Sequence, residues 1–285
     1  MNPATRARLA AAWHTPVTQL ASAIVVLVVA YALAVPSLAH WPFDAIDWEH
    51  IDEPPSAAHW FGTDTAGRDL LVRVAFGART SLSVALLATT VSFAIGLPWG
   101  AFAGYVGGRV DQAMMRIVDV LYALPFVFVV ILLVVVFGRD VRLLFLALGA
   151  LSWLDLARIV RGQTLSIREE TYVLAAESLG ASTAYIVRRH VAPNVLGSAL
   201  VFGTLTIPGV MLAESFLSFL GLGVQEPATS WGVLIADGAR EMEASPWLLA
   251  IPATFLAATL WSFNQLGDRL RDVFDPRHGI AARPL

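Results

Sequence analysis

The sequence predicts an all-α integral membrane protein with six transmembrane helices. Its 285 residues are 57% hydrophobic and 14% charged, and the mean hydropathy is +0.67. Soluble domains carry about 25% charged and roughly 45–50% apolar residues, so this chain departs from them in both directions. A bilayer core of about 30 Å needs roughly 20 apolar residues as helix. Six runs meet this length: residues 17–38, 82–104, 117–137, 141–160, 196–220 and 247–266.

Pro125 lies in the third run, Pro208 in the fifth and Pro252 in the sixth. Such prolines are tolerated in membrane helices and often produce a kink. The first run has two interpretations. Arg6 and Arg8 precede it, and residues 32–34 (Ala-Leu-Ala) resemble the cleavage site of a signal peptide. The run exceeds the usual h-region of about 7–15 residues, which favours a retained helix.

The composition excludes several classes of function. No cysteine is present, which excludes disulfides, thiolate metal sites and cysteine nucleophiles. All 19 basic residues are arginine and no GxxxxGK[ST] pattern occurs, so the chain has no P-loop for ATP. The net charge of −3 gives no basic field for nucleic acid. No HExxH or GxSxG motif lies in the apolar runs, so we expect no catalytic residue, no metal site and no enzyme activity.

Arginine placement predicts the orientation in the membrane. With the N-terminus inside, 13 arginines fall in inside segments and 6 in outside segments. Acidic residues have the opposite bias and crowd the first outer loop at Asp44, Asp47, Glu49, Asp52 and Glu53. An even number of spans then places both termini in the cytoplasm.

Four segments organise the chain. Residues 1–40 form a cytoplasmic tail and the first helix, and residues 41–80 form an extracytoplasmic loop with an amphipathic segment. Residues 81–268 hold five further helices with a cytoplasmic loop at 161–195, and 269–285 form a cytoplasmic tail. In the outer loop, Gly62, Asp64 and Gly67 favour structural turns over a cation loop, because their spacing fits no calcium loop.

Three acidic residues lie within or near the apolar runs, where an ionisable group is costly and often functional. Asp119 follows Arg116 by three residues and Asp155 precedes Arg158 by three, so we expect local ion pairs. Glu214 has no basic neighbour at helical spacing. Two alternatives remain for Glu214: it lines a water-filled path as a pore or gate residue, or it hydrogen-bonds to a neighbouring helix.

Residues 171–194, named here the docking segment, are polar and rich in small residues although apolar runs flank them. Tyr172, Ala175, Ala176 and Leu179 share one face of a predicted helix. Gly180 predicts a C-terminal cap or a turn after that helix.

Ser182 predicts the start of a second short helix, and Pro193 predicts its end. The docking segment is therefore expected to be helix, glycine elbow, helix. The arginine pair Arg188 and Arg189 leaves two interpretations open: a topology signal that binds anionic lipid, or a surface that docks another protein.

The docking segment resembles the EAA motif of binding-protein-dependent ABC importer permeases: E-A-A, three residues, G, nine residues, then I-x-L-P. Ala175, Ala176 and Gly180 match in order, and residues 190–193 (HVAP) stand at I-x-L-P. Leu174 occupies the position of the glutamate, and Glu177 lies three residues later.

The resemblance extends from residue 61 to residue 277, about three quarters of the chain. The ending R-H-x-x-P-N resembles the dipeptide, oligopeptide and nickel branch. Further stretches resemble the C-type permease subunit of that branch: FGTD-x-x-GRD, GAR-x-SL, GY-x-GG-x-x-D, MR-x-x-D, SFLGLGVQ, SWG and GD-x-LRD-x-x-DPR.

The resemblance implies a type I ABC importer transmembrane domain in a bacterial cytoplasmic (inner) membrane. It implies a pore formed with a second homologous permease, two cytoplasmic ATPases that bind ATP and magnesium, an extracytoplasmic binding protein, and no cofactor on this chain. Di- or oligopeptides are the implied cargo, with nickel chelates or glutathione as alternatives. A proton-coupled secondary transporter using Glu214 and Asp155 is the alternative from another class. The implied ATPase-coupling residues are Tyr172, Ala175, Ala176, Glu177, Gly180, Ala181, Arg188, Arg189, His190, Pro193 and Asn194.

Overall fold

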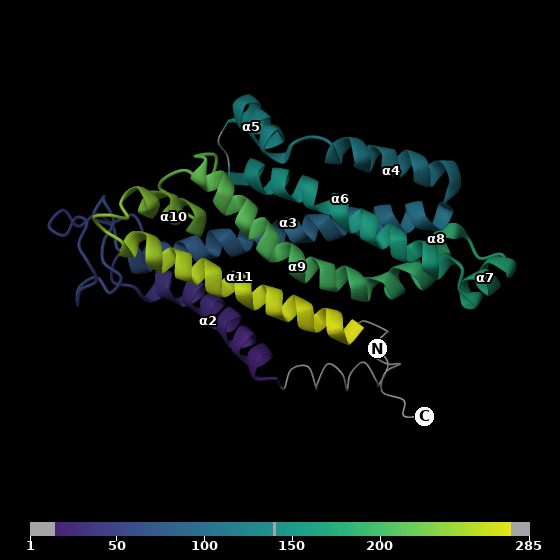
Figure 1. Cartoon of the computed structure of the whole chain (residues 1–285), viewed down its shortest axis with the longest axis horizontal. Helices are drawn as coiled ribbons and strands as arrows, with labels where there is room; N and C mark the ends of the chain where they lie inside the picture. The colour runs from purple at the N-terminus through teal and green to yellow at the C-terminus, as the bar shows by residue number, and fades with distance from the viewer. Residues whose placement is uncertain (1–14, 139–140, 275–285) are drawn as a thin grey trace.

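The computed structural model describes residues 15–138 and 141–274, and within these ranges the chain is helical with no strand. The predicted tails beyond these ranges, with Arg6, Arg8, Arg277 and Arg283, lie outside the described residues. Figure 1 shows the helices packed lengthwise into an elongated body. They are α2 (Pro16–Leu38), α3 (Leu70–Val106), α4 (Gly108–Tyr122), α5 (Phe126–Phe137), α6 (Val141–Arg168), α7 (Thr171–Ser178), α8 (Thr183–Ile186), the π turn η1 (Val187–Val191), α9 (Ala192–Phe219), α10 (Trp231–Arg240) and α11 (Trp247–Phe274).

Four of the described helices are long and apolar enough to cross a bilayer, and a fifth span results if α4 and α5 count as one. The four are α2, α3, the continuous helix Thr183–Phe219 and α11. The predicted class, an all-α membrane protein, is confirmed. The fourth predicted run lies in α6, which carries Asp155, Arg158, Arg161 and Arg168 toward its end. The count of six spans therefore stays a prediction.

The third predicted span is not a single straight helix. It forms α4 and α5, which meet at an angle of 77°. Pro125 stands at the start of α5 in an extended conformation, with ψ of 120°. A proline cannot donate a helical hydrogen bond, and its ring disfavours helix at the preceding residue. Pro208 and Pro252, in contrast, lie inside α9 and α11, which continue through them.

The predicted amphipathic segment and the second span are one helix, α3, which runs across residue 80. Its 37 residues correspond to about 55 Å at 1.5 Å per residue. Asp69 begins the helix, because its Oδ1 accepts a hydrogen bond from the Val72 N–H at 3.0 Å. α3 therefore connects the outer loop directly with the opposite end of the molecule (Figure 1).

Glycines let α3 and α6 pack with their backbones in contact. Gly96, Gly100 and Gly104 lie four residues apart on the α3 face that meets α6. A Cβ at Gly96 or Gly104 would stand 2.8 Å from a backbone carbonyl oxygen of α6, and one at Gly100 would collide with the Ala157 carbonyl oxygen. Small residues at four-residue spacing are a common means of close packing between membrane helices.

Two ion pairs fasten α4 to α6. Arg161 donates to both carboxylate oxygens of Asp111 at 2.6 Å each, and Arg158 donates to Asp119 at 2.9 Å. Both predicted local pairs are therefore wrong: Asp119 pairs with Arg158 rather than Arg116, and Arg158 does not pair with Asp155. The reason is that the α4–α6 contact brings a partner from another helix closer than the residue three positions along the chain.

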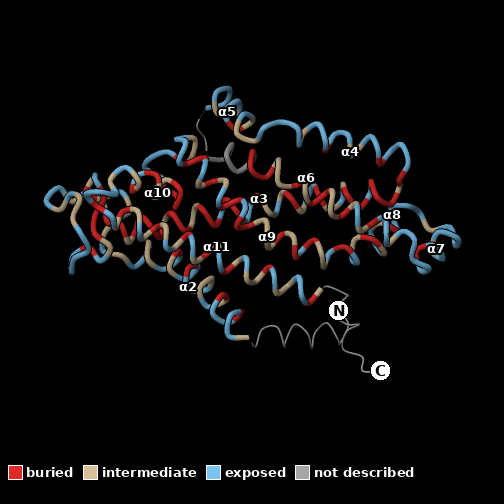
Figure 2. The backbone as a smooth tube through the Cα atoms, in the orientation of Figure 1, coloured by how far each residue is buried: buried red, intermediate tan, exposed pale blue. Residues whose placement is uncertain are grey.

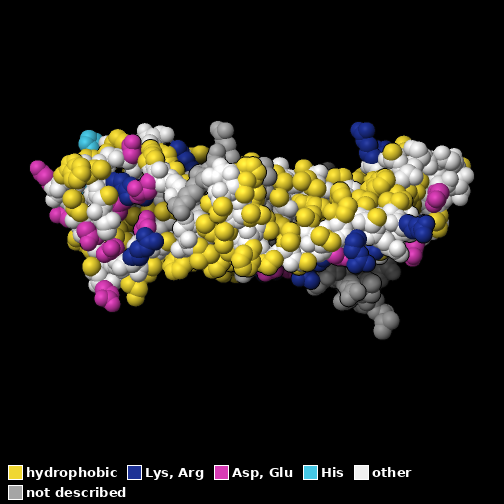
Figure 3. All heavy atoms as spheres, turned by 90° about the horizontal axis from the view of Figure 1, so that it is seen from above, with side chains coloured by type: hydrophobic (Ala, Val, Ile, Leu, Met, Phe, Trp, Pro, Cys, Tyr) yellow, Lys and Arg dark blue, Asp and Glu magenta, His cyan; other side chains and the backbone are white. Residues whose placement is uncertain are grey.

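Burial and charge follow the long axis of the molecule. Figure 2 shows buried backbone concentrated in α3, α6, α9 and α10, whereas α2, α4 and α5 expose much of their length. Figure 3 shows hydrophobic side chains across the middle of one face and charged side chains toward both ends; acidic side chains are most numerous at the end with loop 39–69, and arginines occur at both ends. The middle band has the composition that a lipid environment requires.

The turns predicted in the outer loop are confirmed. Asp64 Oδ1 accepts hydrogen bonds from the N–H groups of Ala66 and Arg68, both at 2.9 Å. Gly62 and Gly67 have φ of +79° and +73°, a conformation that suits glycine. Arg68 also pairs with Glu226 at 2.9 Å and so links this loop to the loop before α10.

Candidate coupling site

The elbow of the docking segment is a hydrogen-bonded helix end. After α7, the Ala181 N–H donates to the Ala176 carbonyl at 3.1 Å, and the Gly180 N–H donates to the Glu177 carbonyl at 2.9 Å. Gly180 has φ of +81°. This pair of bonds around a left-handed glycine is the Schellman arrangement that terminates helices. The prediction of a helix followed by a glycine elbow is confirmed.

The second helix begins as predicted but does not end at Pro193. The Ser182 hydroxyl accepts from the Tyr185 N–H at 3.3 Å and begins α8. The chain then passes through the π turn η1 into α9 without a break, and Pro193 lies in the first turn of α9. In the π turn the Ala192 N–H donates five residues back, to the Val187 carbonyl. The wider turn immediately before Pro193 accommodates a residue that has no N–H to donate.

Tyr172, Tyr185, His190 and Asn194 form a group that we name the aromatic clasp. Asn194 Nδ2 donates to the Tyr172 hydroxyl at 3.1 Å and to the His190 carbonyl at 2.6 Å. The His190 ring lies 5.9 Å from the ring of Tyr172 and 5.9 Å from that of Tyr185. Burial and the nearby Glu170 carboxylate raise the pKa of Tyr172, so its hydroxyl stays protonated at neutral pH. The clasp fixes α7 against η1.

The inner face of the docking segment packs into the body of the protein. Val173 and Ile186 are completely buried, and Ala176 and Ala181 lie partly buried beside them. They join a cluster that we name the inner cluster, whose other buried members come from α3, α6, η1 and α9. Those members are Ala101, Tyr105, Leu156, Val160, Val191, Val195 and Ala199. α7 therefore shares one packed cluster with three long helices.

The outer face of the docking segment is exposed and apolar. Leu179 is 88% exposed, Tyr185 53% and Leu174 48%. The predicted site residues Ala175, Glu177, Arg188, Arg189, Pro193 and Asn194 are also exposed. Ala176 departs from the predicted face, because it turns inward beside Val173.

Sequence reasoning missed Val173, Ile186 and Tyr185. Val173 and Ala176 are three residues apart, which is the spacing of one helix face. The sequence pattern could therefore have indicated that this side of α7 is buried. Tyr185 had no such signal, because its exposure depends on how α8 packs.

Glu214 lies far from the docking segment and is completely buried. Its carboxylate accepts hydrogen bonds from three serine hydroxyls: Ser230 at 2.6 Å, Ser218 at 2.8 Å and Ser81 at 3.3 Å. Ser81 belongs to α3 and Ser230 caps α10, so the carboxylate joins these helices to α9. The alternative that Glu214 hydrogen-bonds to a neighbouring helix is confirmed.

A cavity of about 610 Å³ opens between the α4–α5 bend, α6 and α9. Leu121, Phe126, Leu151 and Phe202 are among its apolar lining residues, and among the described lining residues Asp155 alone is charged. This cavity, and not Glu214, therefore presents an acidic side chain to open space within the helical body.

The comparison with family models decides what kind of protein this is. Residues 96–279, more than half of the chain, match the family described as binding-protein-dependent transport system inner membrane component. The chain belongs to this family. It is therefore a multi-pass inner-membrane permease of ABC importers and not an enzyme, as predicted, and membership argues against the proton-coupled alternative.

Permeases of named transport systems align with most of this chain. The oligopeptide transport system permease protein of Escherichia coli is 49% identical over 256 residues, which are 89% of this chain and 85% of that protein. The dipeptide transport system permease protein of Bacillus subtilis is 49% identical over 225 residues, 79% of this chain and 70% of that protein. The glutathione transport system permease protein of Shigella boydii is 37% identical over 262 residues, 90% and 85% of the two chains.

A solved structure supports the fold of this permease. A methionine ABC transporter in inward-facing conformations matches with a TM-score of 0.56 at 20% identity, over 69% of this chain and 94% of that chain. The match confirms the predicted ABC importer fold for the transmembrane core.

Proposed function

We propose that this permease forms a pore with a second homologous permease and imports di- or oligopeptides across the bacterial inner membrane. Two cytoplasmic ATPases, which bind ATP and magnesium, dock on it from inside, and an extracytoplasmic binding protein delivers the cargo. The names of the oligopeptide and dipeptide relatives support this cargo class at 49% identity, against 37% for the glutathione relative. Nickel chelates and glutathione are the cargoes against which peptides must be tested.

The proposed orientation places α7 and α8 in the cytoplasm, together with both termini. The arginine bias of the sequence supports it, as does the position of α7 and α8 at the end of the molecule opposite loop 39–69 (Figure 1). The acidic loop then faces the binding protein. Exposed apolar residues of α2 and α5 face lipid or the second permease in this arrangement.

The observation that carries the coupling role is the two-sided construction of the docking segment. Leu174, Leu179 and Tyr185 present apolar area outward, where an ATPase groove would bury it, while Val173 and Ile186 insert into the inner cluster. Closure of the ATPases displaces α7, and the inner cluster passes that displacement to α3, α6 and α9. Two alternative packings of these helices then give inward and outward access.

Charge contributes to docking at the same surface. Arg188 and Arg189 are exposed on η1 beside the apolar face. Cationic side chains at the rim of an interface favour encounter with an acidic partner surface and fix its register. We therefore assign them to pairing with acidic residues of the ATPase, in addition to any contact with anionic lipid.

Glu214 and Asp155 receive different roles in this proposal. Glu214 holds α10 against α3 and α9, because all its hydrogen-bond partners are buried serines. Asp155 faces the cavity beside the α4–α5 bend and is the acidic side chain available to a passing cargo.

Reconstitution of the whole importer tests the proposal. The permease is co-purified with its paired permease and ATPases, and ATP-dependent uptake of labelled di- and oligopeptides into proteoliposomes is measured. We expect Leu179→Arg to abolish both ATPase co-purification and uptake, because it places a charge in the apolar contact. Leu38→Arg is the matched control, since Leu38 is 81% exposed but lies at the end of α2 near the outer loop. Equal behaviour of the two variants, or uptake without the ATPases, would overturn the coupling role.

A further inference from the structure

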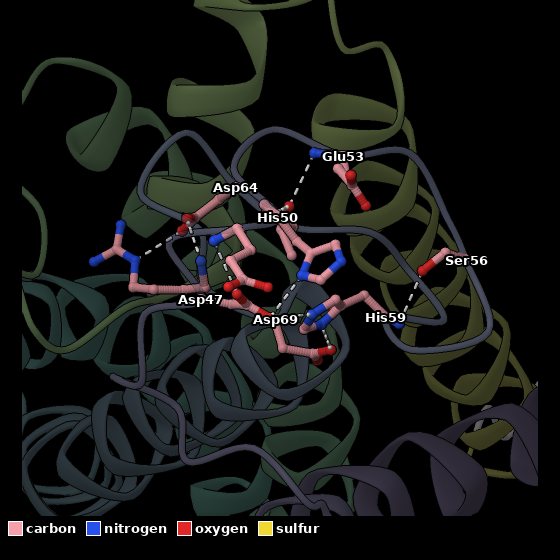
Figure 4. A network of polar contacts seen from close by, with 10 residues as sticks. Asp47, His50, Glu53, Ser56, His59, Asp64 and Asp69 are labelled. Carbon is pink, nitrogen blue, oxygen red and sulfur yellow. Dashed lines mark hydrogen bonds and ion pairs between the residues drawn. The ribbon is translucent and has the colours of Figure 1, made fainter.

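Loop 39–69 brings together a cluster of metal-ligating side chains that transport does not explain. Asp47, His50 and His59 each offer a ligand atom, and these atoms lie within 4.8 Å of one another. Figure 4 shows the three side chains close together, with Asp69 beside the ring of His59. The sequence alone predicts no metal site, because the three residues follow no recognised ligand spacing.

The loop backbone fixes the positions of these residues. The Asp47 N–H donates to the Gly67 carbonyl at 2.8 Å, and the His59 N–H donates to the Ser56 hydroxyl at 3.1 Å. The His59 side chain is only 1% exposed, and its ring packs 5.0 Å from that of Trp41. His50 is more exposed and free to adjust. The cluster is thus a shaped site on an ordered loop and not a group of solvated side chains.

Asp69 determines which nitrogen of His59 faces the cluster. The Nδ1 of His59 lies 2.8 Å from Asp69 Oδ2, and the other oxygen of that carboxylate caps α3. A buried carboxylate that accepts from Nδ1–H leaves the lone pair on Nε2, which is the arrangement of histidines that ligate zinc. The Nε2 atom points toward Asp47 Oδ2 at 3.4 Å.

In the tautomer that donates from Nδ1 to Asp69, this contact brings two acceptors face to face. The lone pair of His59 Nε2 meets an oxygen of Asp47, and the same oxygen lies 2.9 Å from Nδ1 of His50. A cation between them turns the contact from unfavourable to favourable. Ligands at about 2.0–2.1 Å from zinc in a tetrahedral site lie roughly 3.3 Å apart. The 3.4 Å separation of His59 Nε2 from Asp47 Oδ2 fits this value, and His50 Nδ1 lies 2.9 Å from the same oxygen. All three ligand atoms lie within 4.8 Å of one another, so a shift of the His50 side chain completes the site.

We propose that Asp47, His50 and His59 bind a zinc ion at the extracytoplasmic face, with Asp69 orienting His59 from the second coordination sphere. Two imidazole nitrogens and one carboxylate oxygen suit zinc, whereas calcium and magnesium take oxygen ligands. Three protein ligands leave a fourth position for water or for a donor from outside. The ion fastens loop 39–69 to the first turn of α3 through Asp69.

Zinc binding to the purified importer complex tests this assignment without reference to transport, so its failure is distinguishable from failure of the proposed function. The full-length chain carries an affinity tag without histidine, and the complex is stripped with a chelator. It is then dialysed against zinc, and bound metal is measured by mass spectrometry. We expect one zinc per chain. Zinc at background level would overturn the proposal.

Variants then locate the site. His50→Ala removes a partly exposed ligand, and we expect it to weaken zinc binding at least about tenfold; Asp69→Asn, a second-sphere change, is expected to cost about 10–100-fold. His40→Ala is the matched control, because His40 lies exposed in the same loop outside the cluster. Unchanged binding in His50→Ala contradicts the site.

A spectroscopic measurement on the unaltered protein covers the case in which the variants do not fold. X-ray absorption at the zinc edge is expected to show two imidazole nitrogens and one carboxylate oxygen at about 2.0–2.2 Å. Coordination by oxygen alone would overturn the proposal.

Discussion

Asn194 of α9 donates a hydrogen bond from its side chain to the Tyr172 hydroxyl of α7, across 3.1 Å. The same amide nitrogen donates to the His190 carbonyl at 2.6 Å. The first bond joins the start of α9 to the start of α7, and the second fixes the Asn194 side chain against η1. Both lie at the opposite end of α7 from the Gly180 elbow. The elbow and the clasp therefore tie α7 to the chain that continues into α9 at two places.

Tyr172→Phe tests the clasp. The change removes the hydroxyl but keeps the ring against His190, so we expect a loss of about 0.5–1.5 kcal/mol in the attachment of α7, the usual net value of one hydrogen bond. ATPase activity stimulated by cargo is expected to fall while complex assembly persists. Tyr172→Ala also removes the ring contact and is expected to reduce both. Stimulated ATPase activity equal to the unaltered protein in Tyr172→Ala would show that the clasp does not transmit movement.

Gly180→Pro is expected to abolish uptake without loss of membrane insertion. The Gly180 φ of +81° is closed to proline, and the change also removes the N–H that donates to the Glu177 carbonyl. Gly180→Asn is the matched control, because asparagine tolerates the left-handed conformation and a Cβ here meets no atom within 4 Å. Uptake by the asparagine variant and none by the proline variant supports the elbow. Normal uptake in Gly180→Pro contradicts it.

The two alanines of the motif are expected to respond differently to arginine. Ala176→Arg forces a charge into the packed side of α7 beside Val173, so it is expected to abolish uptake and lower thermal stability. Ala175→Arg lies on the exposed side and is expected to impair ATPase docking with thermal stability unchanged. Melting of the detergent-solubilised permease, measured with ATPase co-purification, separates the two effects. Identical profiles for both variants would count against the two-sided construction.

Glu214→Gln and Glu214→Leu distinguish a structural carboxylate from a gate. The glutamine keeps an acceptor for Ser218 and Ser230, so we expect near-normal stability. The leucine leaves buried hydroxyls without an acceptor, at about 1–3 kcal/mol for each group, and we expect a lower melting temperature. A Glu214→Leu protein with unchanged melting but blocked uptake would restore the pore or gate interpretation.

Gly100→Val is expected to lower the yield of folded permease, because the new side chain collides with the Ala157 carbonyl oxygen. Overpacking of this kind typically costs about 1–3 kcal/mol. Gly162→Val is the control, since a Cβ at Gly162 in α6 meets no atom within 4 Å. Fluorescence-detected size-exclusion chromatography in detergent measures both. Comparable monodisperse peaks for the two variants would contradict the close α3–α6 contact.

Local chemistry predicted much of the docking segment. Gly180 marked the elbow and Ser182 marked the start of α8, because both act through hydrogen bonds within a few residues of themselves. Pro193 led to a wrong prediction, because a proline usually ends a helix. Here the π turn before it accommodates Pro193 within a continuous helix, and no local sequence rule predicts that π turn. Pro125 was expected only to kink a span, but the span is interrupted there and forms two helices, α4 and α5, that meet at 77°.

Contacts between helices could not be predicted from rules that use only neighbouring residues in the sequence. Asp119 and Arg158 are 39 residues apart, and only the packing of α4 on α6 makes them partners. The cluster at His59 likewise depends on how loop 39–69 folds back on α3. The glycines at 96, 100 and 104, in contrast, form a pattern of small residues at four-residue spacing that was readable in the sequence and indicates helix contact.

Those three glycines also bear on how the permease changes shape. Most packed helices interlock through the side chains of both partners, but here α3 contributes no side chain: its glycines face backbone carbonyl oxygens of α6 and the inner side-chain atoms of Leu156, Val160 and Thr164. The α3 glycines have no side chain that must change rotamer when one helix slides along the other, and shear of this kind is a common way for packed helices to move. The glycine face that brings α3 and α6 closest together is thus also the place where one helix can slide along the other with the least rearrangement.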